Sequence, residues 1–145
     1  MSVTTDIQGQ VARITLDNPD KRNAFDDIII ASLTEAFEKI GSDASVRVVV
    51  LQAAGKHFSA GADLNWMCAM GKLDAQQNQQ DALRLAALMQ AIDQCAKPVI
   101  ARVQGAAFGG ALGLICAADM AVAADNARFC LSEVKLGIVP AVISP

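Results

Sequence analysis

The 145-residue chain has no tyrosine and a single histidine, and aromatic residues make up only 4% of it. So few rings argue against a surface on which nucleic acid bases stack. The chain has no block of lysine or arginine, and its formal net charge is −3 at pH 7. We therefore expect neither nucleic acid nor an anionic membrane surface to be its partner.

Several catalytic and nucleotide-binding motifs are also missing. There is no HExxH or GxSxG segment and no GKS or GKT, and the glycine-rich segment from Gly105 does not follow the GxGxxG pattern. The only histidine, His57, has no partner of the kind a catalytic triad needs, which favours a packing role. The sequence therefore argues against a zinc protease, a serine hydrolase, a Rossmann protein and a P-loop protein.

The spacing of the cysteines and the length of the apolar runs indicate the cellular compartment of the protein. The cysteines Cys68, Cys95, Cys116 and Cys130 show neither CxxC nor metal-type spacing, so we expect reduced thiols, no metal site and a cytoplasmic protein. Charged residues interrupt each apolar run before the roughly 20 residues of a membrane span, and the start of the chain lacks a signal-peptide pattern. Hydrophobic residues nevertheless make up 53%, which predicts apolar surface covered by a partner subunit or by further chain.

What the sequence does contain is an alternation of apolar strands and amphipathic helices. A nearly continuous β-branched run around Val48 predicts a strand buried on both faces. Asp26 or Asp27 and, later, Asp74 are candidate helix caps. This alternation predicts an α/β fold with a mainly parallel sheet. The expected strands are 11–16, 46–51 and 99–103, and the expected helices are 27–40 and 75–92.

A strand, a loop of small residues and a helix follow one another twice, around residues 46–70 and 99–118. In the second unit Gly105, Gly109 and Gly110 allow the backbone to approach a ligand closely. The first amides of the following helix have no intrahelical acceptor, so they could bind a developing oxyanion. Tight packing of helix on strand is an equally good interpretation of these glycines.

The candidate acid-base groups are carboxylates, because the one histidine has no partner. Glu133 lies among apolar residues and is a candidate general acid or base. The alternative is that Glu133 caps a helix or pairs with Lys135. Asp63 and Asp119 follow small or apolar residues, and for both we expect a turn or cap role rather than catalysis.

Four segments in order resemble the enoyl-CoA hydratase/isomerase (crotonase) superfamily over essentially the whole chain. They are Asn18-Pro-Asp-Lys-Arg-Asn-Ala-Phe25, His57-Phe-Ser-Ala-Gly-Ala-Asp-Leu64, Gln104-Gly-Ala-Ala-Phe-Gly-Gly-Ala111 and Phe129-Cys-Leu-Ser-Glu-Val-Lys-Leu-Gly137. The resemblance implies a spiral of repeated ββα units. It also implies that residues 1–145 are the N-terminal core of such a fold, truncated before the C-terminal helices of the family.

The same resemblance implies a site and its partners. The amides of Ala62 and Gly110 would hold the thioester oxygen of an acyl-CoA, and Glu133 would act as general acid and base. CoA belongs to the substrate, so the resemblance implies no separate cofactor and no metal, and it implies a homo-trimer or hexamer. The residues expected to bind CoA are Lys21, Arg22, Ala24, Ala60, Ala62, Asp63, Leu64, Asn65, Gly109 and Gly110.

One position departs from the family's hydratase pattern. Hydratases of the family usually carry a second glutamate, and its position here is Gly113. A single base suffices to move a proton between carbons, so this departure favours a 3,2-enoyl-CoA isomerase.

The segments His57–Met67, Gly105–Ala111 and Pro140–Pro145 instead resemble bacterial 3-methylglutaconyl-CoA and isohexenylglutaconyl-CoA hydratases of leucine and acyclic-terpene breakdown. We therefore expect a hydratase for a branched or carboxylated enoyl-CoA. The isomerase and a truncated, inactive acyl-CoA-binding fragment are the alternatives.

Overall fold

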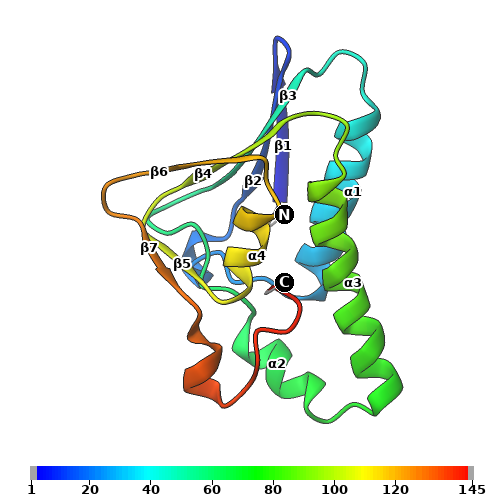
Figure 1. Cartoon of the computed structure of the whole chain (residues 1–145), viewed down its shortest axis with the longest axis vertical. Helices are drawn as coiled ribbons and strands as arrows, with labels where there is room; N and C mark the ends of the chain where they lie inside the picture. Colours follow the sequence, from blue (N-terminus) through cyan, green and yellow to red (C-terminus); the bar gives the residue numbers. More distant parts are fainter. Residues whose placement is uncertain (1–2, 144–145) are drawn as a thin grey trace.

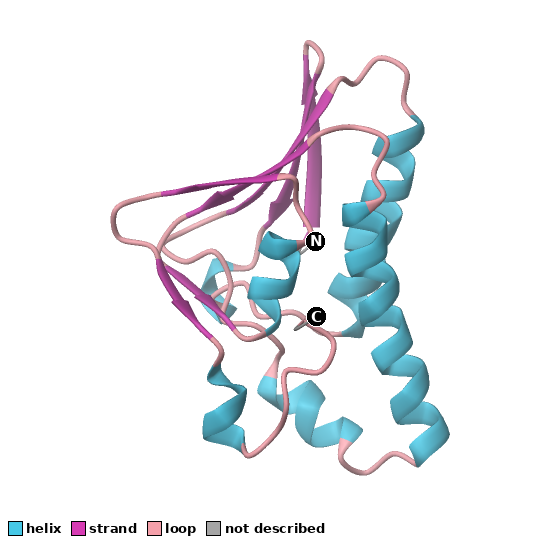
Figure 2. Cartoon of the chain, viewed as in Figure 1, coloured by secondary structure: helices cyan, strands magenta, loops and turns pink. Residues whose placement is uncertain are grey.

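A curved sheet lies on one side of the molecule and two long helices lie on the other (Figures 1 and 2). The structure, a computed structural model, describes residues 3–143. The strands are β1 (Val3–Gln8), β2 (Val11–Leu16), β3 (Val48–Ala53), β4 (Val99–Val103), β5 (Ala106–Phe108), β6 (Met120–Ala123) and β7 (Arg128–Cys130). The helices are α1 (Asp27–Ser42), α2 (Leu64–Met70), α3 (Ala75–Asp93) and α4 (Gly110–Cys116), with 3-10 helices η1 (Pro19–Lys21) and η2 (Ser132–Leu136).

The larger sheet has the order β1-β2-β3-β4-β6. Only β1 runs antiparallel to its neighbour, and β2, β3, β4 and β6 are parallel. The short strands β5 and β7 form a second parallel pair. The predicted mainly parallel α/β fold is therefore confirmed.

Both long helices begin where the sequence predicts. The Asp26 carboxylate accepts a hydrogen bond of 3.0 Å from Ile29 N and caps α1. At α3 the Asp74 carboxylate accepts from Gln77 N at 2.8 Å, and the Gln77 side chain accepts from Asp74 N at 3.2 Å. This reciprocal pair is a capping box, and α1 and α3 then pack side by side, as Figure 1 shows.

The core lies between the sheet and these helices. α1 buries Phe37 and Leu33, and α3 buries Leu88 and Ile92. The prediction that the strand around Val48 is buried on both faces is wrong for the described residues. Val49 and Leu51 of β3 are buried, whereas the side chains on its other face are only half-buried, because no described helix covers that face completely.

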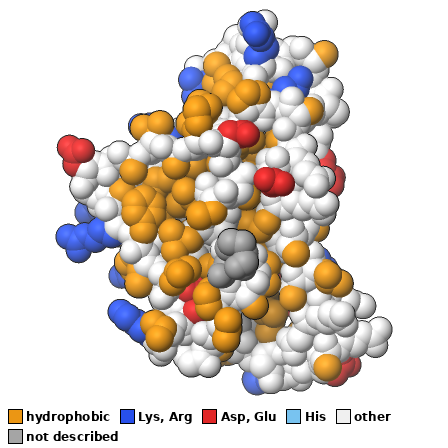
Figure 3. Space-filling model, in the orientation of Figure 1, with side chains coloured by type: hydrophobic (Ala, Val, Ile, Leu, Met, Phe, Trp, Pro, Cys, Tyr) orange, Lys and Arg blue, Asp and Glu red, His pale blue; other side chains and the backbone are white. Residues whose placement is uncertain are grey.

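Apolar side chains gather on the surface around β6 and β7 (Figure 3). All four residues of β6 are exposed, and Val122 and Phe129 each expose half or more of their surface. The predicted excess of apolar surface is thus present, and its covering by a partner stays a prediction. No helix within residues 3–143 is long and apolar enough to cross a lipid bilayer.

Candidate active site

Two loops that are far apart in the sequence are joined by backbone hydrogen bonds. Ser59 N donates to Ala106 O at 3.1 Å, and Phe108 N donates to Ser59 O at 3.0 Å. A Cβ built on Gly61 would lie 2.6 Å from Phe108 O and 3.4 Å from Gly110 N. The absence of a side chain at Gly61, whose φ is +88°, therefore lets the two loops touch.

The contact brings the amides of Ala62 and Gly110 to one cavity. Phe25 N donates to Gly61 O and Asp63 N donates to Phe25 O, both at 2.9 Å, so the Ala62 N–H lies on the opposite edge of its segment. Gly110 N is the first amide of α4. Within residues 3–143 neither amide has an acceptor, and both residues line the cavity. Two free donors at one site are what an oxyanion requires.

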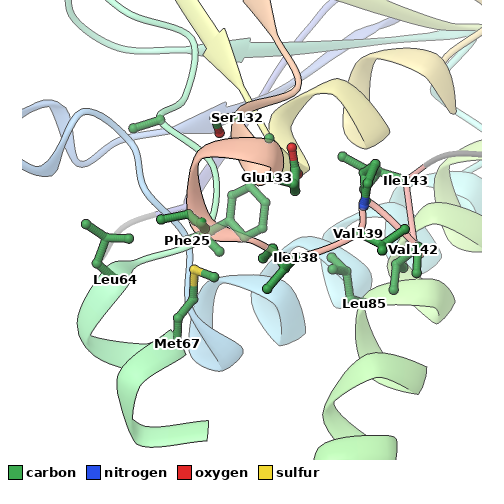
Figure 4. Close-up of a pocket in the computed structure, with 17 residues that line it drawn as sticks. Phe25, Leu64, Met67, Leu85, Ser132, Glu133, Ile138, Val139, Val142 and Ile143 are labelled. Atoms are coloured by element: carbon green, nitrogen blue, oxygen red, sulfur yellow. The ribbon is translucent and has the colours of Figure 1, made fainter. Parts of the chain in front are cut away.

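The cavity has a volume of about 210 Å³ and is mostly apolar. Its lining includes the side chains of Phe25, Leu64, Met67, Leu85, Val142 and Ile143. Glu133 from η2 reaches the same space, as Figure 4 shows. The structure therefore brings the three predicted catalytic residues, Glu133, Ala62 and Gly110, together.

Glu133 occupies an unusual environment for a carboxylate. It is half-buried, and its Oε2 atom has essentially no exposed surface and no hydrogen-bond partner among the described residues. Its Oε1 atom lies 3.1 Å from the point that a Cβ of Gly109 would occupy. Leaving a buried carboxylate oxygen unpaired is costly, and such groups cluster at functional sites.

The alternative interpretation of Glu133 as a cap or ion-pair residue is not supported. The residue that precedes η2 is Leu131, which makes no side-chain cap bond. No ion pair joins Glu133 and Lys135 in the described part of the chain. The carboxylate is thus free to act on a ligand.

Apolar groups pack against Gly113, the position to which the resemblance assigns the family's second glutamate. A Cβ on Gly113 would lie 2.6 Å from Ile143 Cγ2 and 2.8 Å from Met89 Cε. A carboxylate side chain at this position would displace both groups. Among the described residues, Glu133 is the only acid that lines the cavity.

The segments expected to bind CoA lie next to one another. Ala60 N donates to Arg22 O at 2.9 Å, and Lys21 Nζ lies 3.7 Å from Asp63 Oδ2. Arg22 also lines a second cleft of about 640 Å³, together with Lys56. CoA binding by Lys21, Arg22, Ala24, Ala60, Ala62, Asp63, Leu64, Asn65, Gly109 and Gly110 stays a prediction.

Two buried side chains that hold these loops in place were not predicted from the sequence. Asn23 Oδ1 accepts from Asn18 N at 2.8 Å, and Asn23 Nδ2 donates to Ala54 O at 2.8 Å and His57 O at 2.9 Å. The Ser59 hydroxyl donates to Asn23 O at 2.7 Å and accepts from Gly61 N. Only the burial of both residues reveals these roles.

Asn23→Ala is expected to lower the free energy of unfolding by about 2–4 kcal/mol, because it removes three hydrogen bonds and leaves buried backbone groups unpaired. Urea denaturation measures this change. Asn78→Ala, which removes one exposed side-chain bond of 3.2 Å, is the matched control, with an expected loss below about 1 kcal/mol. Equal losses in the two variants would contradict the role of Asn23.

His57 and Asp119 have the structural roles that the sequence favours. His57 Nδ1 accepts from Ala106 N at 3.1 Å, next to the contact between the loops. The Asp119 carboxylate accepts from Val99 N at 2.7 Å at the start of β4. Neither residue lines the cavity with Glu133.

Asp63 caps α2 and is held as a carboxylate. Hydrogen bonds from Trp66 N at 3.1 Å and Asn65 N at 2.8 Å, with the positive charge of Lys21, hold the pKa of Asp63 below its ordinary value, although burial acts in the opposite direction. A lowered folded-state pKa stabilises the protein fully above the ordinary Asp pKa, and this stabilisation is lost as pH falls through the lowered value.

Asp63→Asn keeps an oxygen acceptor for the cap but removes the titration. The stability advantage of the wild type over Asp63→Asn is therefore expected to be constant above about pH 5 and to shrink as the pH falls below about 4. Urea denaturation of both proteins across this range measures it. An advantage that grows toward low pH would contradict the lowered pKa.

Comparison with known proteins agrees with this geometry. The sequence model for the family described as enoyl-CoA hydratase/isomerase matches residues 6–144. An enoyl-CoA hydratase of Alternaria alternata is 39% identical over 94% of this chain and 44% of its own length. The human mitochondrial Delta(3,5)-Delta(2,4)-dienoyl-CoA isomerase is 35% identical over 92% of this chain and 43% of its own length.

The crystal structure of an enoyl-CoA hydratase from Shewanella pealeana superposes with a TM-score of 0.97 and 51% identity, covering all of this chain and 55% of that one. The expected crotonase-like fold is thereby confirmed. The chain spans about half the length of the curated relatives it matches. A match over nearly all of its residues and the shared fold show that the chain belongs to the enoyl-CoA hydratase/isomerase family.

Proposed function

We propose that this protein adds water across the 2,3 double bond of an enoyl-CoA thioester. The observation that carries the proposal is that Glu133, whose buried Oε2 atom has no hydrogen-bond partner among residues 3–143, lines the same cavity as the amides of Ala62 and Gly110, which have no acceptor there either. The amides would bind the thioester oxygen, whose negative charge grows as the enolate forms. The carboxylate is the one acid-base group that lines the cavity within residues 3–143.

In the proposed reaction Glu133 acts twice. Its carboxylate takes a proton from water as the water oxygen bonds to C3 of the enoyl group. The π electrons move through C2 to the thioester oxygen, where the amides of Ala62 and Gly110 stabilise the enolate. Glu133 then returns the proton to C2, the thioester carbonyl re-forms, and the carboxylate is restored.

The second candidate function is 3,2-enoyl-CoA isomerisation. Gly113 favours it, because a glycine supplies no second carboxylate beside Glu133. One base then moves a proton between two carbons of the substrate. The similarity to a dienoyl-CoA isomerase supports the same candidate.

For the acyl group we propose a branched chain, as in 3-methylglutaconyl-CoA. The aliphatic lining of the cavity supports the branched hydrocarbon part of such a substrate. No lysine, arginine or histidine of the described residues lines the cavity. The second carboxylate of a glutaconyl group would therefore need a partner outside this lining.

Further proposals concern the domain that the chain forms, its localisation and its assembly. We propose that residues 1–145 form the crotonase-like N-terminal core of a cytoplasmic protein that assembles as a homo-trimer or hexamer. The exposed apolar residues of β6 and β7 supply surface for such an assembly. The competing possibility is an acyl-CoA-binding fragment without activity.

Absorbance of the conjugated enoyl thioester tests the function. Incubation with crotonyl-CoA or 3-methylglutaconyl-CoA is expected to decrease this absorbance, because hydration removes the double bond. An increase with a 3-enoyl-CoA, without a decrease for either 2-enoyl substrate, would support the isomerase. No change with any of the three substrates would support the inactive fragment.

A further inference from the structure

Of the side chains that line the cavity within residues 3–143, two are polar. These are Ser132 and Glu133, which are adjacent in η2 (Figure 4). The Ser132 hydroxyl makes no hydrogen bond with any other side chain or backbone group of residues 3–143. It is therefore available to a ligand in the cavity.

The oxygens of the two side chains lie beside the same glycine, Gly109. Ser132 Oγ lies 3.3 Å and Glu133 Oε1 lies 3.1 Å from the position that a Cβ of Gly109 would occupy. Both oxygens therefore lie beside Gly109, and both residues line the cavity. A water molecule in the cavity next to this glycine can approach both groups and hydrogen-bond to them.

Water addition is favoured by two contacts that orient the attacking oxygen, and among the described residues only one carboxylate, that of Glu133, lines the cavity. Gly113 supplies no second acid, and Met89 and Ile143 pack against it. A hydroxyl has one donor and two acceptor lone pairs, so Ser132 can accept a hydrogen bond from the water O–H that does not point to Glu133.

We infer that Ser132 is a further catalytic residue, which holds the attacking water beside Glu133. The inference rests on the proposed hydration. One water proton points to the Glu133 carboxylate and the other to Ser132 Oγ, which leaves an oxygen lone pair to attack C3. Glu133 takes the first proton and later delivers it to C2, while the second proton stays on the new hydroxyl group of the product.

The test compares two reactions of the native protein that share Glu133 and the oxyanion amides. Hydration of crotonyl-CoA needs the held water, whereas exchange of the α-protons of butyryl-CoA in heavy water needs only the base and the amides. In Ser132→Ala the ratio of hydration to exchange is expected to fall about tenfold to a hundredfold, the effect of losing one hydrogen bond to a group that develops charge. The ratio is independent of how much of the variant is folded.

Ser132→Thr keeps the hydroxyl and is expected to restore the ratio to within about threefold of the wild type. Ser32→Ala, at a half-buried serine of α1 whose hydroxyl donates to Ile28 O and which does not line the cavity, is the matched control and is expected to leave the ratio unchanged. An unchanged ratio in Ser132→Ala would overturn the role of Ser132 alone. A wild-type protein that exchanges α-protons without hydrating would overturn the proposed function, and this role with it.

Discussion

Replacing Glu133 by glutamine is expected to lower kcat for water addition by about 10²–10⁴-fold, the range for a lost general acid-base group. The amide has nearly the same shape as the carboxylate, so KM is expected to change little. The buried Oε2 atom has no hydrogen-bond partner in the described residues, and a neutral amide is easier to bury than a charged group. The Tm of Glu133→Gln is therefore expected to equal or exceed that of the wild type.

Steady-state hydration kinetics and thermal unfolding measure both effects. Glu38→Gln is the matched control, because Glu38 is an exposed glutamate of α1, far from the cavity lining. It is expected to leave kcat and Tm unchanged. Undiminished turnover by Glu133→Gln would remove Glu133 from the mechanism.

The second large effect is expected at Gly61, where an alanine should lower kcat by about 10²–10³-fold, as for loss of an oxyanion donor. The added Cβ would lie 2.6 Å from Phe108 O, which forces the loop of Ala62 away from the loop of Gly110. The left-handed backbone at φ +88° adds a strain of about 1–2 kcal/mol for a residue with a Cβ. Activity and stability should therefore fall together.

Gly9→Ala separates the strain from the contact between the loops. Gly9 also has a positive φ, of +62°, but a Cβ there would have no atom within 4 Å. It is expected to lose about 1–2 kcal/mol of stability without loss of kcat. Urea denaturation and hydration kinetics compare the two variants, and full activity of Gly61→Ala would contradict the proposed oxyanion site.

Local sequence signals predicted the long helices and the central strands. The apolar faces and caps of α1 and α3 depend on neighbours in the chain, so periodicity and an acidic cap residue suffice to find them. The sequence indicates β1 and β6 less clearly. All but one of their residues are exposed, so no buried face requires apolar and polar residues to alternate along these strands. The prediction that the strand around Val48 is buried on both faces was wrong, because the burial of a strand depends on which other elements cover the sheet.

The site could be predicted only in part. Both the residue types and the family resemblance pointed to Glu133 and to the small residues at the ends of strands. The roles of Asn23, Ser59 and Ser132 depend on contacts across the fold, such as the bonds from Asn23 Nδ2 to Ala54 O and His57 O. A short polar residue in a loop looks the same in the sequence whether its side chain hydrogen-bonds to water or to buried backbone groups.

The most direct test of hydration by Glu133 is the mass of the thioester after incubation of crotonyl-CoA with the native protein in water labelled with heavy oxygen. We expect a product that has gained one labelled water molecule, and no such product with Glu133→Gln. A thioester of unchanged mass, together with conversion of a 3-enoyl-CoA to its 2-enoyl isomer, would contradict hydration by Glu133.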